Sequence, residues 1–152
     1  LLADRLVEAG RLGQKSGAGY YRYNPETRAR EEDPAVAEII DATRAELGIT
    51  PRQVSEEEIV DRLTLALANE GARILEEGIA QRASDIDVVY CFGYGFPRFR
   101  GGPMHVAESR GIQSVVDTIA RFHDSLAAEN WLIAPLLARL AEPGGRLADV
   151  GR

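Results

Sequence analysis

The chain has 152 residues, of which 45% are hydrophobic and 28% charged, as expected for one modest globular protein with a real core. Its 24 acidic and 18 basic residues give a formal net charge of −6, which argues against a nucleic-acid surface or an anionic membrane as partner. No apolar run approaches the ~20 residues of a membrane span, and the amino end lacks a signal-peptide pattern.

Residues 1–23 are predicted to form an amphipathic helix followed by a closing arm. The helix carries its apolar residues on one side and ends at Gly10. The glycines and tyrosines of residues 13–23 favour a turn and extended structure, so we expect a hairpin or an extended arm there. The Gly-Ala-Gly sequence at 17–19 does not indicate a dinucleotide site, because aromatic residues follow it where a helix would be needed.

Residues 24–33 are rich in charged and turn-forming residues and are predicted to be a solvated linker. A helix is expected to begin after them, because Asp33 can cap it and Pro34 suits its first position. Apolar residues on one stripe continue this helix to Gly48.

The longest helix is predicted from Ser55, which has capping-box spacing with Glu58, to Gly78. Its apolar face is broad. Gly71 in its middle costs about 1 kcal/mol relative to alanine, so we expect another helix to approach closely at this position.

A second capped helix is predicted to lead into a corner of glycines, prolines and aromatic residues. Ser84 and Asp87 have capping-box spacing at its start. Gly93 and Gly95 stop the helix, and Pro97 prevents it from resuming. Two interpretations remain open for the aromatic side chains: they pack into a core, or they also face a ligand or a partner. These side chains are Phe92, Tyr94, Phe96 and Phe99.

Three shorter helices are predicted after the corner, over residues 103–110, over 112–126 and around 136–140. The domain then has about five to six helices and no credible parallel sheet. The predicted fold class is all-α, with a short closing arm or hairpin in front of the helical domain.

Few residues suit catalysis or metal binding. We expect His105 and His123 to be surface or partly buried helix residues. Cys91 lies on the apolar side of its helix and is expected to be buried and unreactive. One cysteine cannot form an internal disulfide, which agrees with a reducing, cytoplasmic location. We expect no metal site and no catalytic residue in this chain, which has no cysteine–histidine cluster.

Three motifs in order resemble a known family. They are NEGARILEEGIA at residues 69–80, SDID at 84–87, and the aromatic corner that ends in GGP at 101–103. Together they resemble the C-terminal helical domain of the 3-hydroxyacyl-CoA dehydrogenases, particularly the multifunctional β-oxidation enzymes that also contain an enoyl-CoA hydratase. The sequence LVEAGRLGQKSGAGYYRY at 6–23 is similar to the tail that closes the first copy of this domain.

The resemblance implies that residues 1–23 are the tail of a first helical repeat, residues 24–33 a linker, and residues 34–152 a second repeat. A short internal match agrees with a duplication: RLVEAGRLG at 5–13 resembles RLAEPGGRLAD at 139–149. Coincidence remains the alternative, since many helices end in this way.

The resemblance also implies a parent enzyme that uses NAD to oxidise 3-hydroxyacyl-CoA to 3-oxoacyl-CoA. Its dinucleotide-binding domain, first helical domain and catalytic histidine–glutamate pair would lie upstream, so this chain alone is expected neither to bind NAD nor to catalyse the oxidation. The catalytic copy has a substrate-contacting asparagine where this chain has Asp61, which cannot donate a hydrogen bond. We therefore expect a non-catalytic repeat, with Asp61 facing solvent or beside Arg62.

Phe92 is the single candidate substrate-binding residue, because it matches an aromatic residue near the bound acyl-CoA in multifunctional relatives. The family typically has tyrosine there.

Two functions remain open. The chain packs against the catalytic repeat and completes the substrate cleft of the parent enzyme, or it is a stand-alone helical interaction or dimerisation module. An apolar face without its usual partner predicts a homodimer, with the long helix near Gly71 or the corner at 93–103 in the interface.

Overall fold

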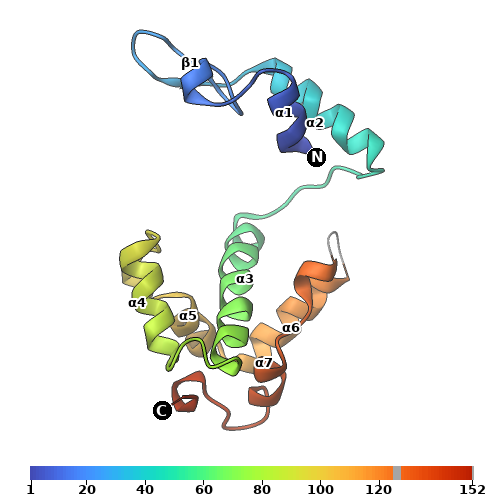
Figure 1. The fold of residues 1–152 in the computed structure, drawn as a ribbon. Coiled ribbons are helices and arrows are strands. Elements are labelled where there is room, and N and C mark those ends of the chain that lie inside the picture. Colours follow the sequence, from blue (N-terminus) through green and yellow to red (C-terminus); the bar gives the residue numbers. More distant parts are fainter. Residues whose placement is uncertain (125–127, 152) are drawn as a thin grey trace. The chain divides into compact units, whose positions relative to one another are not determined.

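The computed structural model describes residues 1–124 and 128–151, which form two compact units, Leu1–Gln53 and Val54–Arg152 (Figure 1). The described helices are α1 (Leu2–Glu8), α2 (Pro34–Glu46), α3 (Glu56–Glu76), α4 (Ala83–Gly93), α5 (Pro103–Arg110), α6 (Ile112–His123) and α7 (Pro135–Leu140). The all-α prediction is confirmed, and six of these helices lie after residue 33, as expected. The helix predicted over 112–126 ends at His123, and residues 125 and 126 lie outside the described residues.

In the first unit, α1 packs against α2. Leu6 of α1 and Val36 of α2 are buried. Arg5 donates a hydrogen bond to the Thr43 hydroxyl at 3.2 Å and pairs with Glu46. The sequence assigned the helix after residue 33 to the second repeat, whereas these contacts group it with the amino-terminal helix.

The segment predicted to be a linker, 24–33, contains half of a hairpin. Strand β1 (Arg22–Tyr23) pairs antiparallel with β2 (Arg30–Glu31), and Arg22 lies opposite Glu31. The Asn24 side chain builds the turn, since its oxygen accepts backbone hydrogen bonds from Glu26 and Thr27 at 3.0 Å. These side-chain hydrogen bonds stabilise a turn in place of an extended, solvated linker, and the turn brings the two strands together.

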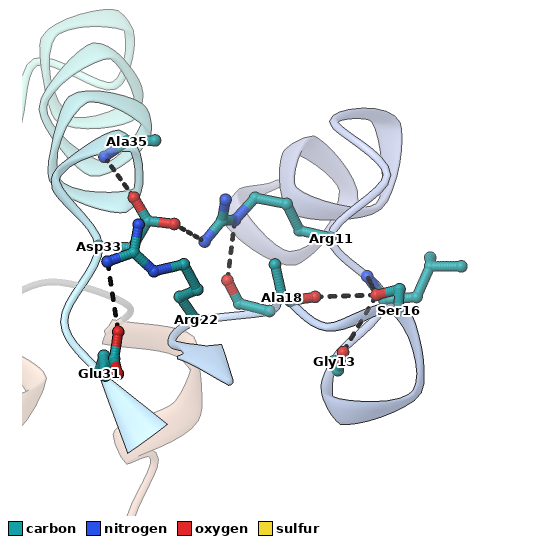
Figure 2. Close-up of polar contacts among 10 residues, drawn as sticks. Arg11, Gly13, Ser16, Ala18, Arg22, Glu31, Asp33 and Ala35 are labelled. Atoms are coloured by element: carbon teal, nitrogen blue, oxygen red, sulfur yellow. Dashed lines mark hydrogen bonds and ion pairs between the residues drawn. The ribbon is translucent and has the colours of Figure 1, made fainter. Parts of the chain in front are cut away.

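Arg11 holds this unit together (Figure 2). Its Nε donates to the Gly19 carbonyl at 2.9 Å, and its guanidinium pairs with Asp33 at 2.7 Å. The other Asp33 oxygen accepts from the Ala35 amide at 3.1 Å, which confirms Asp33 as the cap of α2. The hydrogen bond from Arg11 and then that from Ala35 hold the pKa of Asp33 below its ordinary value.

The glycines at 17–19 do not fit a dinucleotide. Gly17 ends a short 3₁₀ turn, η1 (Gln14–Ser16), in a left-handed conformation, and the chain then runs into β1. A nucleotide phosphate would need a helix that begins at the glycines.

In the second unit, α3 lies between α4 and α5 on one side and α6 and α7 on the other (Figure 1). The core is formed by buried apolar side chains of all five helices and of the carboxyl-terminal turn η4 (Leu147–Asp149). Its largest fully buried apolar members include Leu65, Met104, Val115, Ile119, Leu137 and Leu147. Phe122 and Trp131 pack edge to face, with ring centroids 4.9 Å apart.

Helix α5 packs closely on α3 at Gly71. A Cβ at this position would overlap the sulfur of Met104, so the prediction that another helix approaches here is confirmed. Gly71 is buried inside the unit by this contact. It is therefore not available at the surface, and the expectation that it contributes to a contact between two copies is wrong.

Asn69 fixes the segment that leads into α7. Its amide donates to the Leu132 carbonyl, and its oxygen accepts from the Ala134 amide, both at 2.8 Å. The side chain is buried and has donor and acceptor both satisfied, so it stabilises one arrangement of this segment against α3.

Candidate functional site

The corner between α4 and α5 is the candidate site. Helix α4 begins one residue before Ser84, and the Asp85 carboxylate accepts from the Arg82 amide at 3.0 Å. The predicted capping box of Ser84 and Asp87 is therefore wrong. Past the end of α4, Gly95 has φ +76°, as expected for a glycine that turns the chain.

Asp87 caps the following helix. Its two oxygens accept the backbone hydrogen bonds of Met104 (2.8 Å) and His105 (3.1 Å) at the start of α5. Gly102 has φ +108°, and a Cβ there would overlap the Asp87 carboxyl group. The corner thus requires glycine both for its backbone angle and for the approach of Asp87.

Burial raises the pKa of the Asp87 carboxyl above its ordinary value, while the hydrogen bonds from Met104 and His105 oppose that rise. The sequence analysis missed this long-range cap. A signal was present: Gly102 precedes Pro103 at the start of α5 and has no side chain with which to cap it, so a cap had to come from elsewhere.

A hollow of about 390 Å³ lies beside this cap, lined in part by Ser84, Asp87, His105 and Glu108. Glu108 accepts from the Leu147 amide at 2.7 Å and from Arg146 at 3.1 Å. Both carboxylates are therefore engaged in holding the fold. Among the described side chains, the His105 ring lies within hydrogen-bonding distance of the Ser109 hydroxyl, at 3.4 Å.

The aromatic side chains of the corner face solvent. Phe92, Tyr94 and Phe99 are 68%, 77% and 86% exposed, and Phe96 is partly buried. The interpretation that all four pack into a core is therefore wrong. The apolar pattern was recognised correctly, but no described element covers three of these rings.

Two arginines lie over two of the exposed rings. The Arg98 guanidinium is 4.5 Å from the centroid of the Phe92 ring, and that of Arg100 is 5.6 Å from the Phe99 centroid. Such stacking holds a cation at a defined place on the surface. Sequence reasoning did not single out these arginines.

The sequence suggested that Asp61 faces solvent or lies beside Arg62. This expectation is wrong. Asp61 forms an ion pair with Arg110 of α5, which also donates to the Thr118 hydroxyl at 3.3 Å. The hydrogen bond from Asp61 raises the pKa of Arg110 above its ordinary value. Arg62 instead pairs with Glu58 at 2.8 Å and stacks 4.2 Å from the Phe122 centroid.

The remaining sequence candidates occupy ordinary helix positions. His105 and His123 are exposed, and Cys91 is buried, as expected. Within the described residues, no group of three histidine, cysteine or acidic side chains is placed to hold a metal ion. None of the described helices combines the length and apolar character needed to cross a membrane.

A family model described as 3-hydroxyacyl-CoA dehydrogenase, C-terminal domain, matches residues 59–149. A peroxisomal bifunctional enzyme of Danio rerio is 41% identical over 145 residues, which cover 94% of this chain and 20% of that protein. The human peroxisomal bifunctional enzyme is 42% identical over 123 residues (80% and 17%). The fatty acid oxidation complex subunit alpha of Pseudomonas entomophila is 36% identical over 121 residues (80% and 17%).

The chain is also similar to a solved structure, the dehydrogenase part of multifunctional enzyme 1 from C. elegans. The TM-score is 0.67 at 22% sequence identity, over 91% of this chain and 32% of that one. This likeness concerns the fold. The chain spans about a fifth or less of the length of the curated relatives named above.

Proposed function

Because the chain belongs to the family of 3-hydroxyacyl-CoA dehydrogenase C-terminal domains, we propose that it is a packing domain of a larger fatty-acid β-oxidation enzyme. In this proposal the parent enzyme oxidises 3-hydroxyacyl-CoA with NAD. Its dinucleotide-binding domain and first helical repeat lie outside this chain. The chain itself supplies the second helical repeat, which packs against them.

One observation carries the proposal: in the second unit, α3 and α4 each expose a stripe of apolar side chains that the described residues leave uncovered. On α3, Ile59, Val60 and Leu63 are exposed, and on α4, Val88, Val89 and Phe92 are exposed. In each helix these residues have the spacing i, i+1, i+4, which places them on one face. Exposed apolar stripes of this kind are typical of a domain that packs against another.

The ion pair of Asp61 with Arg110 supports a structural role for this repeat. Both groups are largely shielded from solvent and hydrogen-bond each other, so the Asp61 carboxylate is engaged within the fold. A carboxylate in such a pair cannot replace an amide that donates to a substrate oxygen.

Phe92 remains the candidate contact to acyl-CoA. Its ring is exposed at the end of α4 and is flanked by Arg98, so it is accessible to a ligand held by another domain. We propose that in the parent enzyme this ring lines the substrate cleft. The relatives' names point to peroxisomes and to bacteria, and the cytoplasmic location expected from sequence stays a prediction.

The test of the packing role uses the full-length parent enzyme. Leu63→Asp and Val88→Asp should each lower its thermal stability and its rate of NADH formation, measured at 340 nm, because a charge then enters the packed face. Ile79→Asp is the matched control, since Ile79 is 72% exposed but lies outside both stripes. Unchanged activity and melting in the Leu63 and Val88 variants would rule out the packing role.

The test of the chain alone is direct. Titration calorimetry with NAD should give no binding, and the assay with 3-hydroxyacyl-CoA should give no turnover. Measurable turnover would overturn the assignment of this repeat as non-catalytic.

A further inference from the structure

The first unit contains a basic hollow that the packing role does not use. Its volume is about 570 Å³, and its walls come from the 3₁₀ turn η1 and from the turn that joins β1 to β2. Lys15 and Arg28 line it together with the polar side chains of Gln14, Tyr23 and Asn24. Among the described residues that line the hollow, none is acidic.

The two cations of the hollow are not neutralised inside the unit. Arg11 and Arg22 nearby in sequence each pair with a carboxylate (Figure 2). Lys15 and Arg28 are exposed, and neither forms an ion pair with any of the described residues. Residues 11–30 contain five basic residues and one acidic residue, although the whole chain has a net charge of −6. This segment therefore offers positive charge to an anion.

Backbone hydrogen bonds hold both walls of the hollow in place. The Tyr23 amide donates to the Gly17 carbonyl at 2.9 Å, which ties β1 to the end of η1. The Arg28 amide donates to the Asn24 carbonyl at 2.8 Å across the hairpin turn. The Asn24 side-chain oxygen accepts from the turn, so the group that this side chain can offer a ligand is its NH₂ donor.

Arg28 is held in an unusual backbone conformation. Its φ is +58°, and no other non-glycine residue among the described residues has a positive φ. A residue with a Cβ adopts this region at a cost, and such residues cluster at ligand sites. Glycine would form the turn more easily but would remove the cation. The turn thus gives up backbone stability at the position where it presents a charge.

We propose that this hollow binds a terminal phosphate group, with Lys15 and Arg28 pairing with its two negative charges. Such a group also has three free oxygens, which suit the side-chain donors of Gln14 and Asn24. A carboxylate would bring half the charge and fewer acceptors. Each phosphate of NAD is esterified on both sides and carries one charge, so NAD is not a ligand of this hollow. Side-chain cations hold the phosphate here, in place of the amides of a glycine cradle.

Two sources can supply a phosphate of this kind. One is free inorganic phosphate, and this source is independent of the proposed function. The other is the ribose phosphate of coenzyme A, which the substrate of the parent enzyme would carry, and this source rests on the proposed function. Dephospho-coenzyme A separates the two chemistries, because it lacks that terminal phosphate and keeps the rest of the molecule.

The experiment is a titration of the whole chain at neutral pH, followed by the NMR shifts of its backbone amides. Inorganic phosphate, coenzyme A and dephospho-coenzyme A are the probes. A phosphate-bearing probe should give saturable shifts at Lys15, Gly17 and Arg28. Tighter binding of coenzyme A than of inorganic phosphate identifies the substrate as the source, and the opposite order identifies the free ion; either result supports the site.

Two variants test the cations. Lys15→Gln and Arg28→Gly should each weaken phosphate binding by roughly 10-fold or more, because each removes a charged hydrogen-bond donor. Arg28→Gly also suits the positive φ, so this variant should fold at least as stably as the native chain, as measured by circular dichroism. Arg44→Gln is the matched control: it removes a cation of α2 that pairs with Asp41 and does not line the hollow, and it should leave binding unchanged.

The inference is overturned if neither inorganic phosphate nor coenzyme A shifts these amides, or if dephospho-coenzyme A binds there as tightly as the phosphate-bearing probe. It is also overturned if Lys15→Gln and Arg28→Gly bind like the native chain, or if Arg44→Gln weakens binding equally. These outcomes are measured in the first unit. Failure of the proposed function is measured separately, by the activity and melting of the parent enzyme with Leu63→Asp or Val88→Asp.

Discussion

Helices α2 and α5 begin in the same way chemically but are capped from different distances. Each has proline at its first turn and an aspartate that accepts its first free amides. Asp33 is the residue just before α2. Asp87 reaches α5 from another helix, 17 residues from Met104 in sequence. A local cap can be read from neighbouring residues, whereas a distant cap depends on the fold that brings it there.

The pKa values of the two capping carboxylates are also shifted in opposite directions. Arg11 donates to Asp33 and lowers its pKa, so the charged form is favoured. Asp87 is partly buried without a cation in hydrogen-bonding contact, and burial raises its pKa. The local cap is supported by a hydrogen-bonded cation, whereas the hydrogen bonds to the distant cap come from backbone amides.

The largest effect is expected at Gly102. Gly102→Ala should destabilise the second unit by about 3 kcal/mol, because the new Cβ meets the Asp87 carboxyl at a backbone angle that alanine adopts poorly. Denaturant unfolding followed by Trp131 fluorescence measures this. Gly111→Ala is the control: its φ is +90° with open space around it, so only the backbone strain of about 1 kcal/mol should appear. Equal losses in the two variants would mean that Asp87 does not require the glycine.

Removing the distant cap comes next. Asp87→Ala should destabilise the second unit by about 2 kcal/mol, since two amides at the start of α5 lose their acceptor. Asp87→Asn should lose less, because it retains one oxygen that can accept a hydrogen bond. Hydrogen exchange at the Met104 and His105 amides should speed up in the alanine variant. No change in those rates would contradict the cap.

Removing the local cap should have a smaller effect, confined to the first unit. Asp33→Ala should increase hydrogen exchange at the Ala35 amide, while Trp131 fluorescence unfolding stays unchanged. Asp41→Ala is the comparison, because Asp41 lies on the same helix and pairs with Arg44 one turn away, not with the Ala35 amide. If both variants exchange alike at Ala35, the Asp33 side chain does not cap α2.

The smallest effect expected is on the pH dependence of stability, to which Asp33 and Asp87 should contribute in opposite directions. Asp33 has a lowered pKa, so its stabilisation is full above its ordinary value of 3.8 and is lost as the pH falls through its folded value. Asp87 has a raised pKa, so its contribution becomes less favourable as the pH rises from 3.8 through its folded value. Carboxyl carbon titration by NMR should place the midpoint of Asp33 below 3.8 and that of Asp87 above it. The reverse order would contradict this account.

The elements that the sequence predicted well are those with local causes. Asp33 and Pro34 start α2, Ser55 caps α3, and the glycine after residue 110 separates α5 from α6. Ser84 is not the cap of α4, because the helix begins one residue earlier and the Asp85 carboxylate accepts from the Arg82 amide. The predicted and observed starts of α4 use carboxylates two residues apart, Asp87 and Asp85, and the sequence does not show which of them lies closer to the free amides.

Two features of the candidate site could not be predicted because they depend on contacts across the fold. Asp61 and Arg110 are 49 residues apart and meet only when α3 packs against α5. The exposed rings at Phe92 and Phe99 have an apolar pattern that is identical for a core and for an interface. Composition and periodicity report that a surface is apolar, and the fold decides what covers it.

The thiol of Cys91 allows the opening of the carboxyl-terminal end of α4 to be measured. It is the only thiol in the chain, and it is buried near the end of α4, four residues after the aspartate that ties this helix to α5. A thiol reagent can reach it only when that end of the helix opens, so the labelling rate under native conditions measures how often it does. The native protein therefore carries a reporter of α4 opening that requires no engineered probe.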